Sequence, residues 1–383
     1  FTTTNAAIAF NTSGVDLANK ATTTIDTGTG AGDVTFQGAI ETNGGDNDIL
    51  TVTSGTGTVT FTGAIGATEE LGGLNVNASS GNGVITFTST IGDSGNAGVI
   101  GTTSIGNAAT SDLNFNSTIY KFDGATTITA ASGDTIDMGA GAATTFTTAA
   151  DNITFATGNI ELANKTNLTV DTGATGGNIT IGEIAGTSVE TVTLDAGTGT
   201  TSVGVIGSGT EIGALSIGSA ENGGITLNGA ITTDGVVTLD GPITLATGAI
   251  TITTADDAIN LQGTVDGGQA LTLSSGSAAI TADGAIGSST ALTSLTVNSS
   301  GAGTIEITDI GTSSAAGVSG ATAIGNTSTG TLTLDGTVYT TTGSQTYTAA
   351  TGGGNIDITN TSGSTFTTTN TAVAFNTSGV DLA

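Results

Sequence analysis

The sequence lacks four of the residue types on which much of protein chemistry depends. Its 383 residues include no cysteine, histidine, arginine or tryptophan, and the only basic side chains are Lys20, Lys121 and Lys165. Without cysteine and histidine the chain cannot build a classical zinc site, an iron–sulfur cluster or haem ligation. It also cannot pair a serine or cysteine nucleophile with a histidine base.

Positive charge and long apolar runs are equally scarce. The three lysines stand against 32 Asp and Glu residues, which gives a formal net charge of −29. Such a chain cannot neutralise phosphates, so nucleic acid and anionic membrane surfaces are excluded as partners. No stretch approaches the roughly 18 consecutive apolar residues of a membrane-spanning helix, so we expect no membrane insertion.

Short alternations of apolar and polar residues dominate what remains. The polar member is usually threonine, which favours extended backbone, and the 63 glycines supply the breaks between alternations. No stretch places apolar residues at helical spacing across three turns. The fold class is therefore predicted to be all-β, with no significant helix.

The chain repeats itself at two long intervals. Residues 1–18 return as residues 366–383 with 16 of 18 positions identical, and a third copy begins at residue 146. We interpret 1–145 as a short repeat arm and 146–365 as a long one, with about three extra coils near 220–283. Residues 366–383 then begin the next 365-residue repeat. The ends look like cuts in a longer polypeptide, and a tandem array predicts that Asn-Lys comes directly after Ala383.

A finer repeat specifies the architecture. Triplets such as Leu50-Thr51-Val52 recur at spacings of 22–24 residues. This period favours a parallel β-solenoid, expected to be right-handed, in which each strand pairs with its equivalent one coil away. Inward apolar residues would stack into a narrow core, with phenylalanines in its wider layers. Those phenylalanines include Phe36, Phe61, Phe87 and Phe115.

One segment resembles a known family. Residues 237–287, VTLDGPITLATGAITITTADDAINLQGTVDGGQALTLSSGSAAITADGAIG, look like the repeats of filamentous-haemagglutinin-type adhesins. Those are large bacterial exoproteins with a right-handed parallel β-helix that forms an extended shaft. The resemblance implies an extracellular or cell-surface protein, and it rests on composition and coil style.

Acidic pairs are the candidates for catalysis. They are Glu69-Glu70, Asp256-Asp257, and Asp46 with Asp48. Glycoside hydrolases need two carboxylates at a fixed separation, and lyases of acidic sugars need a basic residue. The Glu69-Glu70 pair is not kept in the matched copies, and few aromatic residues are available to stack sugars. We predict no catalytic residue, no cofactor-binding residue and no enzymatic activity.

Calcium is the one ligand that the pattern suggests. Residues 44–50 resemble the Gly/Asp calcium nonapeptide of β-roll proteins, in a shifted register. An aspartate also recurs after strands and would line one edge of the solenoid. The alternative, which we favour, is an aspartate that binds the backbone of its own turn. The recurrent residues are Asp26, Asp171, Asp195, Asp240 and Asp335.

Two further interpretations concern the surface. Thr-x-Thr spacing, as in Thr251-Ile252-Thr253, is typical of ice-binding faces, but outward Ser, Asn, Asp and Glu interrupt it. The widest departures from the coil pattern are 90–112 and 309–331, with Tyr120 and Tyr339 after them. An adhesin that recognises glycan or host-surface protein would place its contacts there. An irregular coil or a small flap over the core is the other interpretation.

The residues favour a structural function. The repeats, the near absence of reactive side chains and the uncapped pattern indicate a unit of an extracellular filament, stalk, sheath or adhesin shaft. Its expected partner is itself, through β-stacking of 366–383 onto the equivalent of the segment after Leu17. The alternative is the ligand-binding adhesin module.

Overall fold

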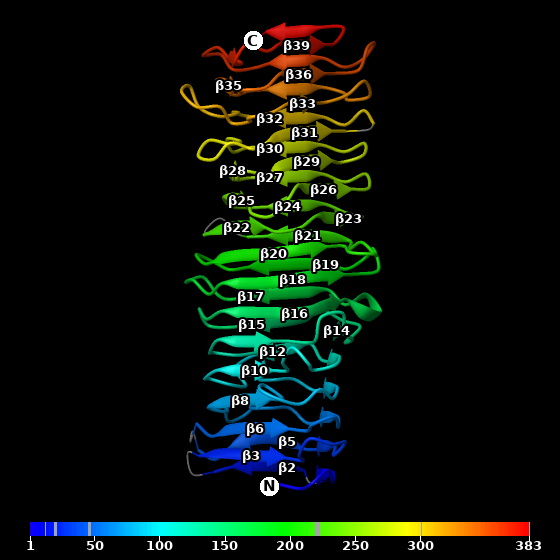
Figure 1. Cartoon of the computed structure of the whole chain (residues 1–383), viewed down its shortest axis with the longest axis vertical. Helices are drawn as coiled ribbons and strands as arrows, with labels where there is room; N and C mark the ends of the chain where they lie inside the picture. The colour runs from blue at the N-terminus through cyan, green and yellow to red at the C-terminus, as the bar shows by residue number, and fades with distance from the viewer. Residues whose placement is uncertain (12, 19–20, 45–46, 219–222, 300, 383) are drawn as a thin grey trace. The chain divides into compact units, whose positions relative to one another are not determined.

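A computed structural model describes residues 1–11, 13–18, 21–44, 47–218, 223–299 and 301–382. The chain divides into two compact units, Phe1–Thr200 and Thr201–Ala383, and each is described by itself. Both consist of short parallel strands stacked as a β-solenoid, with about 15 turns in total (Figure 1). The predicted fold class is confirmed. Among the described residues the only helix is one 3-10 turn, η1 (Ala163–Lys165).

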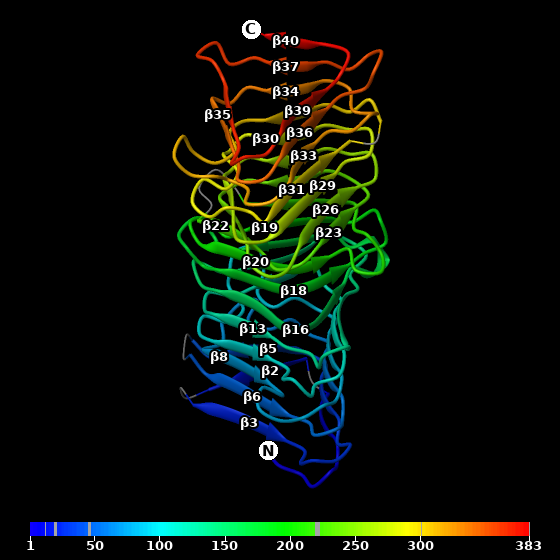
Figure 2. The ribbon, with the colours of Figure 1, turned by 45° about the horizontal axis from the view of Figure 1, so that its top comes forward.

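The first unit is built from nineteen strands. They are β1 (Ile8–Phe10), β2 (Gly14–Leu17), β3 (Thr22–Asp26), β4 (Val34–Phe36), β5 (Ala39–Thr42), β6 (Ile49–Thr53), β7 (Val59–Phe61), β8 (Gly73–Val76), β9 (Ile85–Phe87), β10 (Thr103–Ile105), β11 (Leu113–Phe115), β12 (Ile119–Lys121), β13 (Thr126–Ile128), β14 (Thr135–Met138), β15 (Thr144–Thr147), β16 (Ile153–Glu161), β17 (Leu168–Asp171), β18 (Ile179–Ala185) and β19 (Thr191–Asp195). Each strand pairs in parallel with a strand one turn away, and Figure 2 shows β3, β6 and β8 lying one above another.

The second unit continues the same architecture. Its strands are β20 (Thr200–Ile206, which begins at the last residue of the first unit), β21 (Ala214–Ile217), β22 (Gly224–Leu227), β23 (Ile231–Thr233), β24 (Val237–Leu239), β25 (Ile243–Leu245), β26 (Ile250–Thr254), β27 (Ile259–Leu261), β28 (Val265–Asp266), β29 (Ala270–Ser274), β30 (Ile280–Ala282), β31 (Ser294–Asn298), β32 (Ile305–Ile307), β33 (Thr322–Ile324), β34 (Leu332–Leu334), β35 (Val338–Thr340), β36 (Gln345–Thr348), β37 (Ile356–Ile358), β38 (Thr365–Thr367), β39 (Val373–Asn376) and β40 (Val380–Leu382).

The registers confirm the 22–24-residue period and show how far it stretches. Leu50 pairs with Leu74, a step of 24 residues, and Leu215 pairs with Val237, a step of 22. Other steps fall outside that range, because the turns vary in length while the strands stay in register. The shortest runs from 225 to 243 and the longest from 74 to 103, which are steps of 18 and 29 residues.

The core is a stack of inward side chains, as the alternation predicts. Phe36, Phe61, Phe87 and Phe115 occupy successive turns of the first unit and are at most 1% exposed. Their ring centroids are 5.2, 4.9 and 5.3 Å apart, and neighbouring rings are within 8° of parallel. Burying each phenylalanine stabilises the fold by about 1.5–3 kcal/mol. The hydrophobic stack therefore holds successive turns in register.

Glycine is required where turns approach one another closely. A Cβ atom added to Gly83 would lie 1.7 Å from the carbonyl oxygen of Gly57, and one added to Gly57 would lie 2.4 Å from that of Gly32. These three glycines form a column in which each turn rests on the backbone of the turn before. Any side chain there would push two turns apart and lengthen the backbone hydrogen bonds between their strands.

We expect Gly83→Ala to lower the free energy of unfolding by about 1–3 kcal/mol, because it overpacks a backbone contact that cannot relax locally. Gly182→Ala is the matched control, since a Cβ atom at Gly182 meets nothing within 4 Å. Urea denaturation of the two variants measures the difference. Equal stability of both variants would contradict a structural requirement for the glycine column.

Candidate functional site: the repeated coil and its faces

The three sequence copies adopt the same local structure. We call residues 1–18, 146–163 and 366–383 the first, middle and last copies of the repeated coil. Each places two phenylalanine rings edge to face, with centroids 5.6 Å apart in the first copy, 5.4 Å in the middle and 5.2 Å in the last. The pairs are Phe1 with Phe10, Phe146 with Phe155, and Phe366 with Phe375. The chain is therefore a tandem repeat in structure as well as in sequence.

The middle copy is covered on both sides. Ile153 pairs with Thr126 of the turn before and with Ile179 of the turn after. The ring of Tyr120, one turn earlier, stacks on Phe146 at 4.7 Å and an angle of 21°. Phe146 is completely buried as a result. This copy shows what a complete environment for the repeated coil looks like.

The first copy is covered on one side only. The ring of Phe10 stacks on Phe36 of the next turn at 4.8 Å, and Leu17 is 4% exposed. On the opposite side Phe1 is 73% exposed. An apolar pocket of about 190 Å³ opens there, and Phe1, Phe10, Val15 and Leu17 contribute to its lining. In the middle copy the preceding turn fills the equivalent space.

The last copy has the opposite asymmetry. The ring of Tyr339 stacks on Phe366 at 4.7 Å, as Tyr120 stacks on Phe146 in the middle copy, and Tyr347 stacks on Phe375 at 5.2 Å. The far side of this copy is open, because β40 leaves Val380 41% exposed and Leu382 75% exposed. The first and last copies therefore expose opposite faces of one repeated coil.

Tyrosines hold the turn that precedes each later copy. The hydroxyl of Tyr339 accepts a hydrogen bond from the Gly336 amide at 2.9 Å and donates one to the Ile307 carbonyl at 3.1 Å. The hydroxyl of Tyr120 accepts a hydrogen bond from the Ser117 amide at 2.9 Å. Burial raises the pKa of both tyrosines, so the neutral hydroxyl is maintained. The sequence placed Tyr120 and Tyr339 after two irregular segments, and the structure places both in the core with no exposed surface.

Each copy also stacks one carboxylate on another. In-register neighbours are Asp16 with Glu41, Asp137 with Glu161, and Asp357 with Asp381. Like charges directly opposite one another destabilise a sheet. The effect is visible at Asp137, where burial, then Glu161 and Asp112, raise the pKa of the carboxyl group. Its Oδ1 atom is buried without a hydrogen-bond partner.

The recurrent aspartates mostly have the local role that we favoured. Asp26, Asp171 and Asp195 each accept a hydrogen bond from the glycine amide two residues on, at 2.8, 2.7 and 2.9 Å. Asp335 differs, since its Oδ1 is buried without a hydrogen-bond partner. Across the described ranges, no group of three or more acidic side chains is arranged to hold a metal ion.

The acidic pairs are separated by their hydrogen bonds. Asp256 accepts two bonds from Ser277, both at 2.9 Å, through its amide and its hydroxyl. Asp48 is 1% exposed and accepts a bond from the Ala21 amide, while Asp46 lies outside the described residues. Glu69 contributes its backbone amide to the carboxylate of Glu41 at 2.8 Å. The carboxylates of Asp256 and Asp48 are thus bound to neighbouring turns of the stack.

The outward threonines form mixed ladders. In the second unit Thr253 pairs with Thr232 on one side and with Ser274 on the other. The Thr-x-Thr pattern of 251–253 is therefore continued by serine and, one turn later, by an asparagine, because Ser274 pairs with Asn298. The face does not repeat one side chain at every turn.

Comparisons with known proteins add no family. No protein-family model, no curated protein and no solved structure matches this chain. Within the described part of the chain, none of the helical segments has the length and apolar character needed to cross a membrane. The site is therefore interpreted from its own geometry.

We expect Asp137→Asn to raise the free energy of unfolding at about pH 7 by up to about 1 kcal/mol, the scale of a cross-strand pair. The folded-state pKa of Asp137 is raised, so its stabilising protonated form is present at low pH and lost as pH rises through that pKa. The gain should vanish near pH 3, where the carboxyl group is protonated in both states.

Asp93→Asn is the control with the opposite sign. Backbone hydrogen bonds from Asn96 and Gly95 lower the pKa of Asp93, so this variant should lose stability near pH 7 and recover it on acidification. Urea denaturation at several pH values measures both. A pH-independent effect of Asp137→Asn would contradict the repulsion between stacked carboxylates.

Proposed function

We propose that this chain is a structural repeat unit of an extracellular filament, stalk, sheath or adhesin shaft, extended by end-to-end β-stacking. One residue in three contexts carries the proposal. Leu17, Leu162 and Leu382 are equivalent positions of the repeated coil, and they are 4%, 1% and 75% exposed. The leucine is buried wherever another turn comes after it, so the same neighbour is the natural occupant of the open face.

The opposite face supports the same occupant. Phe1 is 73% exposed, whereas Phe146 is fully buried under the ring of Tyr120. The two open faces therefore differ, and each lacks the side of the coil that the other presents. Association between unlike faces is head to tail, and a head-to-tail contact that does not close into a ring propagates as a filament.

Strand edges favour the same occupant again. β1 pairs with β4, and β39 pairs with β36, so each end strand has one described neighbour. The middle copy's β16 pairs with strands on both sides. Unpaired edges of parallel strands accept further strands, and solenoids normally hide them with a capping element. Here a further turn of the same repeat satisfies the edge.

Composition fits the extracellular part of the proposal. Cysteine and tryptophan are absent, and the single methionine, Met138, is fully buried. Sulfur-containing side chains are the principal targets of oxidation, and exposure increases their reactivity. A chain with this composition persists in an oxidising environment. Immunogold labelling of intact source cells tests the location, and labelling confined to permeabilised cells would contradict it.

We expect the full chain to associate end to end, with rods of increasing length in electron microscopy and a concentration-dependent mass in sedimentation. Leu382→Asp should weaken association about tenfold or more, because it places a charge in the apolar contact. Val189→Asp is the matched control, since Val189 is 53% exposed but lies away from the repeated coil. Added salt should strengthen association by screening the net charge of −29.

A mixing experiment tests the head-to-tail geometry. Phe1→Asp disables one face and Leu382→Asp disables the other, so each variant alone should form no filament. An equal mixture should form dimers, because each variant retains the face that its partner needs. A full chain that stays monomeric at high concentration and high salt would contradict the proposal. So would association that both Leu382→Asp and Val189→Asp weaken equally.

A further inference from the structure

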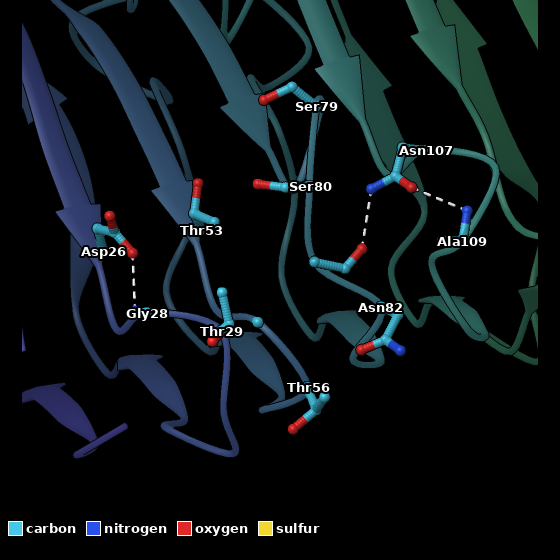
Figure 3. Close-up of a pocket in the computed structure, with 12 residues that line it drawn as sticks. Asp26, Gly28, Thr29, Thr53, Thr56, Ser79, Ser80, Asn82, Asn107 and Ala109 are labelled. Carbon is cyan, nitrogen blue, oxygen red and sulfur yellow. Dashed lines mark hydrogen bonds between the residues drawn. The ribbon is translucent and has the colours of Figure 1, made fainter. Parts of the chain in front are cut away.

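A polar groove lies in the first unit, away from the open faces of the repeated coil. It has a volume of about 470 Å³ and crosses four successive turns, those that come after β3, β6, β8 and β10 (Figure 3). The side chains that line it are mostly hydroxyls and amides. Six of them are Thr29, Thr53, Thr56, Ser79, Ser80 and Asn82.

Unequal turn lengths create the groove. The connection between β6 and β7 spans residues 54–58, whereas the flanking connections span 27–33 and 77–84. The short turn forms the floor, and the longer turns form the two walls. Since β6 pairs in register with both β3 and β8, the strands cannot shift to close the gap.

A buried layer of hydrogen bonds holds these turns rigid. Thr27 and Ser54 are fully buried, and their hydroxyls donate to the carbonyls of Gly32 and Gly57 at 2.6 and 2.7 Å. The Asn107 side-chain amide donates to the Gly81 carbonyl at 2.8 Å and so ties the longest wall to the next turn. Side chains mounted on these turns are therefore positioned in advance.

The lining side chains keep their own hydrogen-bonding capacity. These six hydroxyl and amide side chains take part in no hydrogen bond within the described chain, in contrast to the buried layer beneath them. Hydroxyls and carboxamides both donate and accept, so a ligand must offer both functions in close succession. Figure 3 shows Thr53, Ser79 and Ser80 along the groove, with Thr29 and Thr56 nearer its outer side.

The lining also excludes other ligand classes. It contains no basic residue, and its one carboxylate, Asp26, accepts a hydrogen bond from the Gly28 amide. An anion would meet no positive charge there. The apolar surface comes only from threonine methyl groups, Ala109 and backbone carbon, which suits the face of a sugar ring but offers no pocket for a large apolar group.

We propose that this groove binds a neutral carbohydrate chain across successive turns of the solenoid. The hydroxyl groups of such a chain match the donors and acceptors of the lining one by one. The inference does not depend on end-to-end stacking, because the groove lies on the side of the turns and uses none of the residues of the repeated coil.

The second unit supplies a natural comparison. Gly83 and Gly303 are equivalent, since each rests against the turn before it, so Asn82 corresponds to Ala302. Thr56 corresponds to Ser277, whose hydroxyl and amide both donate to Asp256. The equivalent turns of the second unit therefore lack the amide and have one hydroxyl already in use.

Saturation-transfer NMR and calorimetry of the full chain test the proposal with maltohexaose, cellohexaose and hexagalacturonate. We expect at least one of the two neutral oligosaccharides to bind, and the acidic one to bind more weakly. The double variant Ser80→Ala, Asn82→Ala should weaken binding about tenfold or more by removing two hydrogen-bonding groups. Its folding should be unchanged, because neither side chain makes an internal hydrogen bond.

The control is Ser274→Ala with Ser328→Ala, two hydroxyls on the equivalent turns of the second unit. This double variant should bind like the unchanged chain. Failure of both neutral oligosaccharides to bind, or equal loss in the two double variants, would overturn the proposal. Tighter binding of hexagalacturonate would overturn the assignment to neutral carbohydrate.

Discussion

Parallel pairing of each strand with its equivalent one turn away is the interaction on which the rest of this structure depends. A single turn of three-residue strands buries too little apolar surface to be stable alone. Stacked turns satisfy one another's backbone groups and place like side chains on like, as Val34, Val59 and Ile85 show in the first unit. Stability is then shared between neighbours, and every turn needs a turn on each side.

That requirement explains why the same coil has three different environments. The middle copy has both neighbours and is buried, while the first and last copies lack one neighbour each, on opposite sides. The contrast between Leu162 and Leu382 is a difference of context alone, since the side chain and its place in the coil are the same. A repeat with unlike open faces is suited to polymerisation, which is the basis of the proposed structural role.

Stacking also constrains what the outward positions carry. A charge repeated at every turn would repel its neighbours, and Asp137 with Glu161 shows this on a small scale. Threonine, serine and asparagine avoid the penalty and remain free to bind. Where adjacent turns differ in length, as at residues 54–58 and 77–84, those neutral side chains line a groove. The same composition therefore serves an inert shaft and a surface that matches sugar hydroxyls.

The sequence by itself determined the fold class, the repeat and the inward phenylalanines, because a two-residue period and glycine breaks act locally on the backbone. It also indicated the turn role of Asp26 and Asp171, which depends on an amide only two residues away. Only the tertiary structure decided which faces of the repeated coil are open, where Tyr120 and Tyr339 pack, and where the groove lies. These features depend on which turns become neighbours and how their lengths compare, and that information is spread over steps of 18 to 29 residues.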